Sequence, residues 1–142
     1  VATAVPYSAE KEKFLLTKRT QDTDIHPGKW DFPGGHIRKP DVHESRSEDA
    51  DGHIEDENPK KAALRELKEE TGLKGKVLRT GESFVLDTVD GMFKIHPFLI
   101  LVEGEPELNE EHTEYEWIEP DDLEDFETVK GLDTDLEKLD VL

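Results

Sequence analysis

The apolar residues of the chain form short alternating runs on both sides of one helical segment. The runs at 1–7 and 13–19 are separated by a polar turn, which predicts a β-hairpin at the start of the chain. Similar alternation later in the chain is typical of strands that are half-buried in a sheet. These later strands are expected at 76–79, 82–88, 93–103 and 115–118, with a turn through Asp90-Gly91.

The helical segment has recognisable ends. Asn58 can cap a helix, Pro59 suits the first helical position and Gly72 can end it, so we expect a helix over 59–71. Strands on both sides of this helix predict an α/β fold around a mixed sheet. A second helix is expected near the C-terminus, where four core residues recur at helical spacing: Val129, Leu132, Leu136 and Leu139.

A polar and mostly acidic stretch interrupts these elements at about 37–56. The 142 residues fit one domain, 1–142, in which this stretch is an insertion. Its Asp49-Ala-Asp51-Gly52 is similar to part of a calcium loop, but Ser47 and Asn58 stand where two acidic ligands belong. The alternatives are a flexible loop and a lid over a substrate.

The chain is strongly acidic, with 36 Asp and Glu against 18 Lys and Arg and a net charge of −18. Such a field repels nucleic acid polymers and anionic membranes, so we expect neither as a partner. A small anionic substrate would need a cation that inverts the field locally. An acidic surface is also typical of proteins that stay soluble in concentrated salt, which makes a halophilic source our expectation.

Cysteine is absent, which excludes a disulfide framework, a thiolate zinc site and a nucleophilic thiol. The longest apolar stretch, at 98–102, is too short to span a bilayer, and no signal-peptide pattern is visible at the N-terminus. We therefore expect a soluble, cytoplasmic protein. The six histidines show no zinc-type spacing, so none is expected to be a ligand.

Three carboxylates share one face of the expected helix. Glu66, Glu69 and Glu70 are related by spacings of three and four residues, which place like charges side by side. Oxygen ligands on a rigid element suit Mg²⁺ or Mn²⁺, and Mg²⁺ usually takes its remaining ligands from water and substrate phosphate. The alternative is an acidic face that is merely solvated.

The string Arg65-Glu-Leu-Lys-Glu-Glu-Thr-Gly-Leu73, with Pro33-Gly-Gly35 and Glu57 upstream, resembles the signature of the Nudix hydrolase family (MutT-like). The resemblance implies a Nudix-type α/β/α sandwich with a central mixed sheet. It also implies a Mg²⁺- or Mn²⁺-dependent hydrolase of phosphoanhydride bonds. The substrate would be a nucleoside diphosphate linked to another group, such as a nucleoside triphosphate, including an oxidised one, or a nucleotide sugar.

The same resemblance implies the metal ligands and the groups around them. Glu66, Glu69 and Glu70 would bind the metal, together with the carbonyl of Gly35. Arg65 would orient a signature glutamate, either Glu57 or Glu69; the alternative is an ordinary surface ion pair.

For the general base, Glu111 matches the family's loop position best, since it stands six residues before Trp117, and Glu114 is its rival. Arg19 resembles a position that touches phosphate, and Trp30 offers an aromatic face to the substrate. The simpler interpretations are an edge-strand charge for Arg19 and a core position for Trp30.

The sequence departs from the family signature between Gly35 and Glu57, where 21 residues stand. Because Gly-His-Ile occurs at both Gly35 and Gly52, the signature can also be aligned through Gly52.

Two other functions are alternatives to a hydrolase. A non-catalytic nucleotide-binding module would not need all three helix glutamates, and an isopentenyl diphosphate isomerase, which the segment 26–30 faintly resembles, would need a cysteine. A homodimer is expected from the family alone.

Overall fold

The computed structural model describes residues 1–22, 26–37, 58–89 and 91–141. The expected hairpin is present: β1 (Ala2–Ser8) and β2 (Lys13–Arg19) pair antiparallel beside their turn. The other expected strands are also found, each within a few residues of its predicted bounds. They are β5 (Gly75–Thr80), β6 (Phe84–Thr88), β7 (Gly91–Val102) and β8 (His112–Ile118).

The strands form a mixed sheet in the order β3-β2-β1-β7-β5, with β8 beside β2 and β6 beside β7. Only the pairing of β1 with β7 is parallel among the described strand pairs. The short β3 (Trp30–Asp31) and β4 (Gly34–Gly35) come from one segment but pair with different strands, β2 and β1. Between β3 and β4 the chain therefore crosses from β2 to the beginning of β1.

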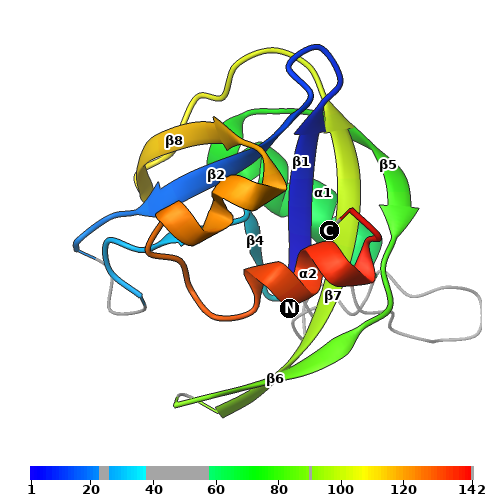
Figure 1. The fold of residues 1–142 in the computed structure, drawn as a ribbon, viewed down its shortest axis with the longest axis vertical. Helices are drawn as coiled ribbons and strands as arrows, with labels where there is room; N and C mark the ends of the chain where they lie inside the picture. Colours follow the sequence, from blue (N-terminus) through cyan, green and yellow to red (C-terminus); the bar gives the residue numbers. More distant parts are fainter. Residues whose placement is uncertain (23–25, 38–57, 90, 142) are drawn as a thin grey trace, which may run out of the picture.

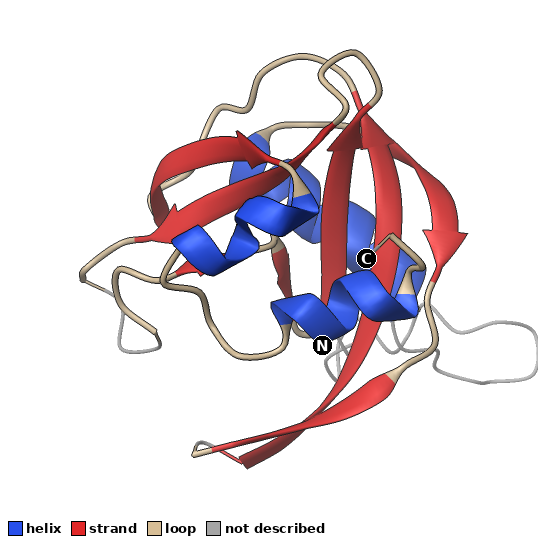
Figure 2. Cartoon of the chain, viewed as in Figure 1, coloured by secondary structure: helices blue, strands red, loops and turns tan. Residues whose placement is uncertain are grey.

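Helices cover both faces of the sheet (Figures 1 and 2). Neighbouring residues of each strand point to opposite faces, so Ala4 packs toward α1 (Pro59–Thr71) while Val5 packs toward α2 (Leu132–Lys138). Each face has its own buried apolar cluster, and the apolar surface buried in each cluster stabilises the packing of its helix on the sheet. The expected α/β/α sandwich with a central mixed sheet is therefore confirmed.

Local chemistry sets the ends of α1. The Asn58 side chain accepts the Lys61 amide at 2.8 Å, a cap worth about 1 kcal/mol. Gly72 ends the helix with a φ of 72°, a left-handed conformation that glycine adopts without strain. The helix bounds expected from the sequence are thus confirmed.

The C-terminal segment differs in detail from the expectation. The four residues at helical spacing are all buried, as expected. The helix α2, however, starts only at Leu132, because Gly131 has a φ of 103° that no helix interior allows. A 3₁₀-helix, η2 (Pro120–Asp125), was not expected from the pattern.

Several sequence-based expectations fall outside the described residues. They are the role of Glu57, the calcium loop, and the lid or flexible loop at 37–56, of which only Ile37 is described. Asp90 of the expected turn is outside as well. Among the helices of the described ranges, none has the length and apolar character that a bilayer crossing requires.

Candidate active site

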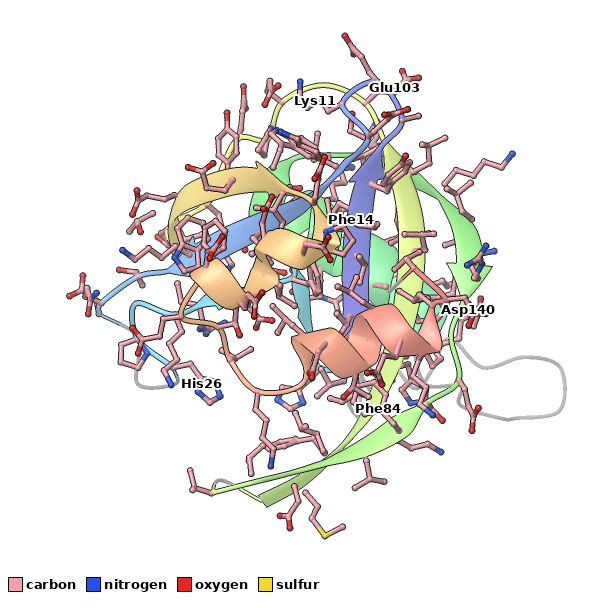
Figure 3. The ribbon with its side chains drawn as sticks, viewed as in Figure 1. Lys11, Phe14, His26, Phe84, Glu103 and Asp140 are labelled. Atoms are coloured by element: carbon pink, nitrogen blue, oxygen red, sulfur yellow. The ribbon has the colours of Figure 1, made fainter. Side chains whose placement is uncertain are left out.

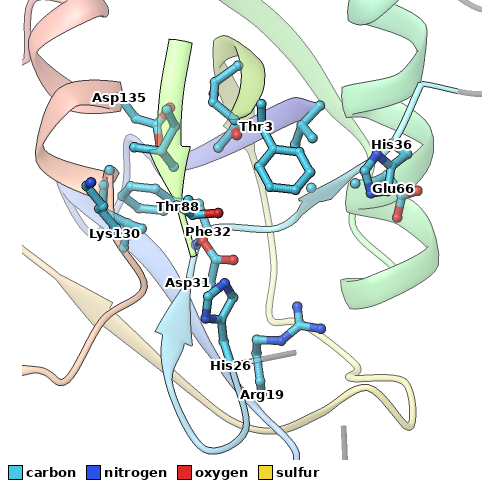
Figure 4. Close-up of a pocket in the computed structure, with 18 of the residues that line it drawn as sticks. Thr3, Arg19, His26, Asp31, Phe32, His36, Glu66, Thr88, Lys130 and Asp135 are labelled. Carbon is cyan, nitrogen blue, oxygen red and sulfur yellow. Dashed lines mark hydrogen bonds between the residues drawn. The ribbon is translucent and has the colours of Figure 1, made fainter. Parts of the chain in front are cut away.

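A pocket of about 520 Å³ opens where β1 begins, beside the crossing from β3 to β4. It reaches from Glu66 on α1 at one end to Asp135 on α2 at the other (Figure 4). Phe84 from β6 and His26 from the segment after β2 also line it (Figure 3). The pocket therefore joins the acidic helix face to the opposite layer of the sandwich.

Glu70 is the most enclosed carboxylate of the acidic end, with only 2% of its surface exposed. Its Oε2 accepts the Gly34 amide at 2.9 Å, and its Oε1 lies 3.5 Å from His112 Nε2. Burial, followed by the charge of Glu66, raises the pKa of Glu70 to about 9. In the absence of a cation this carboxyl would hold a proton at neutral pH.

Arg65 links the acidic face to the β4 segment. Its Nη1 donates to Glu66 at 2.7 Å and to Glu69 at 3.2 Å, and its Nη2 donates to the His36 carbonyl at 3.1 Å. The pKa of Glu66 is raised by burial, against the opposing effect of Arg65. Arg65 thus holds Glu66 in place and also contacts Glu69, one of the two partners that the resemblance implied. The other, Glu57, lies outside the described residues.

Gly35 lies directly against Glu66. A Cβ atom at position 35 would stand 2.6 Å from Glu66 Cδ, well inside the closest approach of two carbons. A larger residue at position 35 would therefore displace the Glu66 carboxylate. The ligand role of the Gly35 carbonyl remains a prediction, and Gly52 lies outside the described residues.

The third glutamate of the helix face is placed differently. Glu66 and Glu70 line the pocket, whereas the side chain of Glu69 is 44% exposed and pairs with Arg65. Successive helix residues turn by about 100°, so Glu69 and Glu70 cannot face the same direction. A metal-binding role for Glu69 remains a prediction.

Two neighbouring residues at the start of β8 bring their side chains close to Glu70. Oxygen and nitrogen atoms of Glu70, Glu111 and His112 lie within 4.8 Å of one another. No histidine was expected at the site, because His112 has no partner at a zinc-type sequence spacing. Burial, and then the charge of Arg19, lowers the pKa of His112 to about 4, so its imidazole is neutral beside Glu70.

Glu111 and its rival Glu114 occupy different surroundings. Glu111 lines the pocket, whereas Glu114 lies on β8 and pairs with Lys18 at 3.2 Å. Of the two, only Glu111 is placed to act on a substrate in the pocket.

Of the two residues expected to touch substrate, Arg19 lines the pocket. Trp30 does not, since its ring packs edge-on against Phe126 with the centroids 5.1 Å apart. This position agrees with the simpler interpretation of Trp30 as a residue at the margin of the core.

The donor set at the acidic end fits a divalent metal ion. Glu66, Glu70 and Glu111 offer carboxylate oxygens, and Gly35 lines the same pocket. A bound cation would also offset the repulsion between Glu66 and Glu70, because the charge of Glu66 is one cause of the raised pKa of Glu70.

Comparisons with known proteins agree with this geometry. The family model for the NUDIX domain matches residues 1–137. A crystal structure of a MutT protein from Methanosarcina mazei Go1 is 25% identical, with a TM-score of 0.71 over 98% of this chain and 90% of that chain. An Ap4A hydrolase binary complex from C. elegans is 22% identical, with a TM-score of 0.66 over 98% and 93%.

A third similar structure is the NUDIX domain of Shewanella oneidensis NrtR in complex with ADP ribose. It is 16% identical, with a TM-score of 0.65 over 96% of this chain and 84% of that chain. A sequence search among curated proteins gives no significant match.

A mixed sheet between two helical layers, with glutamates of one helix facing a pocket, defines a hydrolase of the Nudix type that acts on phosphoanhydride bonds. The chain belongs to the NUDIX domain family. The expected fold and enzyme class are thereby confirmed.

Proposed function

We propose that this enzyme is a Mg²⁺- or Mn²⁺-dependent pyrophosphohydrolase of a nucleoside diphosphate linked to another moiety. The substrate would be a nucleoside triphosphate, including an oxidised one, or a nucleotide sugar. The observation that carries the proposal is the convergence of Glu66, Glu70 and Glu111 with Gly35 at one end of a nucleotide-sized pocket.

The metal would be held by Glu66, Glu70 and the Gly35 carbonyl, with Glu111 close by. When bound, a divalent ion lowers the pKa of a water molecule and neutralises phosphate charge. Other residues of the protein orient the carboxylates. Arg65 keeps Glu66 oriented through its 2.7 Å hydrogen bond, and the Gly34 amide fixes one oxygen of Glu70.

Glu111 is the group that we assign as general base. Its carboxylate is exposed to the pocket and next to Glu70, so it can accept the proton of the water that attacks phosphorus. The attacking oxygen forms the new P–O bond as the bridging oxygen of the anhydride leaves with the bond's electron pair. Arg19, which also lines the pocket, would contact a phosphate oxygen.

The size and charge of the molecule favour a small substrate. A pocket of about 520 Å³ suits one nucleotide, and a net charge of −18 opposes a polymeric nucleic acid. The solved structures similar to this chain include an Ap4A hydrolase and a NUDIX domain in complex with ADP ribose. Both of these compounds are small nucleotides with linked phosphates.

The test is a panel of nucleoside triphosphates, dinucleoside polyphosphates and nucleotide sugars, incubated with the purified protein and Mg²⁺ in high salt. We expect cleavage of one class, loss of cleavage on chelation of the metal, and loss in Glu70→Gln with the fold retained. Tight nucleotide binding without any cleavage would instead support a non-catalytic nucleotide-binding module.

A further inference from the structure

The loop that connects β7 to β8, residues 103–111, is bonded to the end of α1. It is drawn in yellow at the top of Figure 1. The Glu107 amide donates to the Thr71 carbonyl at 2.8 Å. The Asn109 amide donates to the Glu70 carbonyl at 3.2 Å. The last carbonyls of a helix have no partner inside it, so the loop supplies donors to two of them and is fastened to the helix that carries the acidic face.

Asn109 also holds the residue that we assign as general base. Its Oδ1 accepts the backbone amide of Glu111 at 3.0 Å, the contact of an Asx turn. Its carbonyl accepts the His112 amide at 3.3 Å. The carbonyl of Glu111 in turn accepts the Thr20 amide at 3.0 Å. The backbone of Glu111 is thus fixed from both sides, and its N–H is held by the side chain of Asn109.

These contacts connect Glu111 to Glu70 through a single residue. Asn109 donates to Glu70 with its backbone and accepts from Glu111 with its side chain. In the pocket, side-chain oxygens of Glu70 and Glu111 lie within 4.8 Å of each other. Loss of the Asn109 side chain would therefore move Glu111 relative to Glu70 and leave the backbone bonds to α1 in place.

The first half of the loop is held independently of this side chain. Glu105 pairs with Lys11 at 2.7 Å and accepts the Trp117 indole N–H at 3.0 Å. Neither these contacts nor the backbone bonds to α1 involve the Asn109 side chain. Its replacement should therefore disturb Glu111 without release of the whole loop.

We propose that Asn109 is a positioning residue, whose side chain holds the Glu111 backbone so that the Glu111 carboxylate stays beside the metal ligands of α1. The proposal rests on the function proposed above, in which Glu111 accepts a proton from the attacking water. A general base acts only within hydrogen-bonding reach of that proton. Because a misplacement of about 1 Å can cost on the order of a hundredfold in rate, the contact between Asn109 and Glu111 controls the chemical step.

The simpler interpretation is an asparagine that only stabilises its turn. In that case its replacement lowers the melting temperature, and any effect on kcat is the same with or without the base. If Asn109 positions the base, its effect on kcat depends on the carboxylate of Glu111. A double-mutant cycle measures this dependence.

The cycle compares the wild type, Asn109→Ala, Glu111→Gln and the double variant, with Mg²⁺ and the member of the nucleotide panel that the wild type cleaves fastest. We expect Asn109→Ala to lower kcat by about ten- to a hundredfold with little change in KM. In the Glu111→Gln background the same replacement should change kcat by less than about twofold. An equal factor in both backgrounds, or an unchanged kcat of Asn109→Ala, would overturn the proposal.

Asn58 provides the matched control, because it is the other asparagine of the chain and its side chain caps α1. Asn58→Ala should lower the melting temperature and keep the kcat of the wild type. If Asn109→Ala fails to fold, Asn109→Leu, which is similar in size and lacks the acceptor, takes its place in the cycle.

Hydrogen exchange of backbone amides, followed by magnetic resonance, tests the contact without any substrate. Exchange at Glu111 should be several-fold faster in Asn109→Ala, whereas exchange at Glu107, whose amide is bonded to Thr71, should not change. Unchanged exchange at Glu111 would overturn the proposal. Wild-type protein that cleaves no member of the panel would refute the proposed function and this proposal with it, whereas cleavage with equal factors in the cycle would refute the positioning role alone.

Discussion

The imidazole of His112 lies beside the carboxylate of Glu70, with Nε2 of the histidine 3.5 Å from Oε1 of the glutamate. The other oxygen of Glu70 accepts the Gly34 amide, so both oxygens of this buried carboxylate have a fixed neighbour. Groups that orient a metal ligand in this way commonly matter almost as much as the ligand itself. His112 is therefore a positioning residue for Glu70.

Replacement of His112 by leucine should weaken Mn²⁺ binding by about tenfold or more, because Glu70 loses a neighbour that holds it. His112→Asn, which keeps a polar side chain at this position, should recover part of the affinity. Titration of Mn²⁺ by electron paramagnetic resonance measures both values without any substrate. Equal affinities of the wild type and the leucine variant would show that His112 only fills space.

Gly35→Ala should abolish most activity while the protein still folds. The new Cβ would lie 2.6 Å from Glu66 Cδ, so the Glu66 carboxylate must move away from its place in the pocket. A misplacement of about 1 Å at a catalytic site can cost on the order of a hundredfold in rate. Steady-state kinetics with thermal unfolding as a check on the fold test this, and a variant with unchanged kcat would disprove the close approach.

Glu111→Gln should lower kcat by a factor of about 10² to 10⁴, the usual contribution of a general base, with a smaller effect on KM. Glu110→Gln is the matched control, because Glu110 is the exposed neighbour of Glu111 and does not line the pocket. If the two variants have similar kcat values, the base lies elsewhere in the site.

The metal-free protein should lose stability as the pH rises from 7 to 9. Burial raises the folded-state pKa of Glu70 from 4.5 to about 9. A carboxyl with a raised pKa stabilises the fold fully below its unfolded pKa, and this contribution disappears as the pH approaches the folded value. His112, with its pKa lowered to about 4, has already lost its proton in this range and contributes no slope.

Thermal unfolding with a chelator, at several pH values, measures this loss. Glu70→Gln should flatten the decline, although Asp31 and Asp135 keep part of it through their own raised pKa values. Saturating Mg²⁺ should also reduce the decline, since it stabilises the ionised carboxylate. A metal-free melting temperature that is constant or rises between pH 7 and 9 would refute the buried, protonated state of Glu70.

The parts of the molecule that could be predicted from sequence are those with local causes. The cap at Asn58, the stop at Gly72 and the four core positions from Val129 to Leu139 are read directly from neighbouring residues. The helix glutamates were recognisable because their spacing is a local pattern as well. Even so, the Glu69 side chain lies toward Arg65 and solvent because of helical geometry. Sequence spacing alone did not distinguish it from Glu66 and Glu70, which line the pocket.

The parts that could not be predicted depend on segments that meet only in the fold. Gly35 reaches Glu66 because β4 pairs with β1, and His112 reaches Glu70 because β8 pairs with β2. Asp31 and Asp135 come from opposite parts of the chain and share a cavity only in the sandwich. No periodicity or sequence spacing carries this information, since it resides in strand register and layer packing.

The most direct test of the central claim is product analysis in H₂¹⁸O by phosphorus magnetic resonance and mass spectrometry, with the substrate class identified from the panel. We predict Mg²⁺-dependent cleavage of the anhydride, one ¹⁸O atom in a phosphate product, and loss of both in Glu70→Gln. Nucleotide that binds at the pocket but remains uncleaved with either Mg²⁺ or Mn²⁺ would contradict the account.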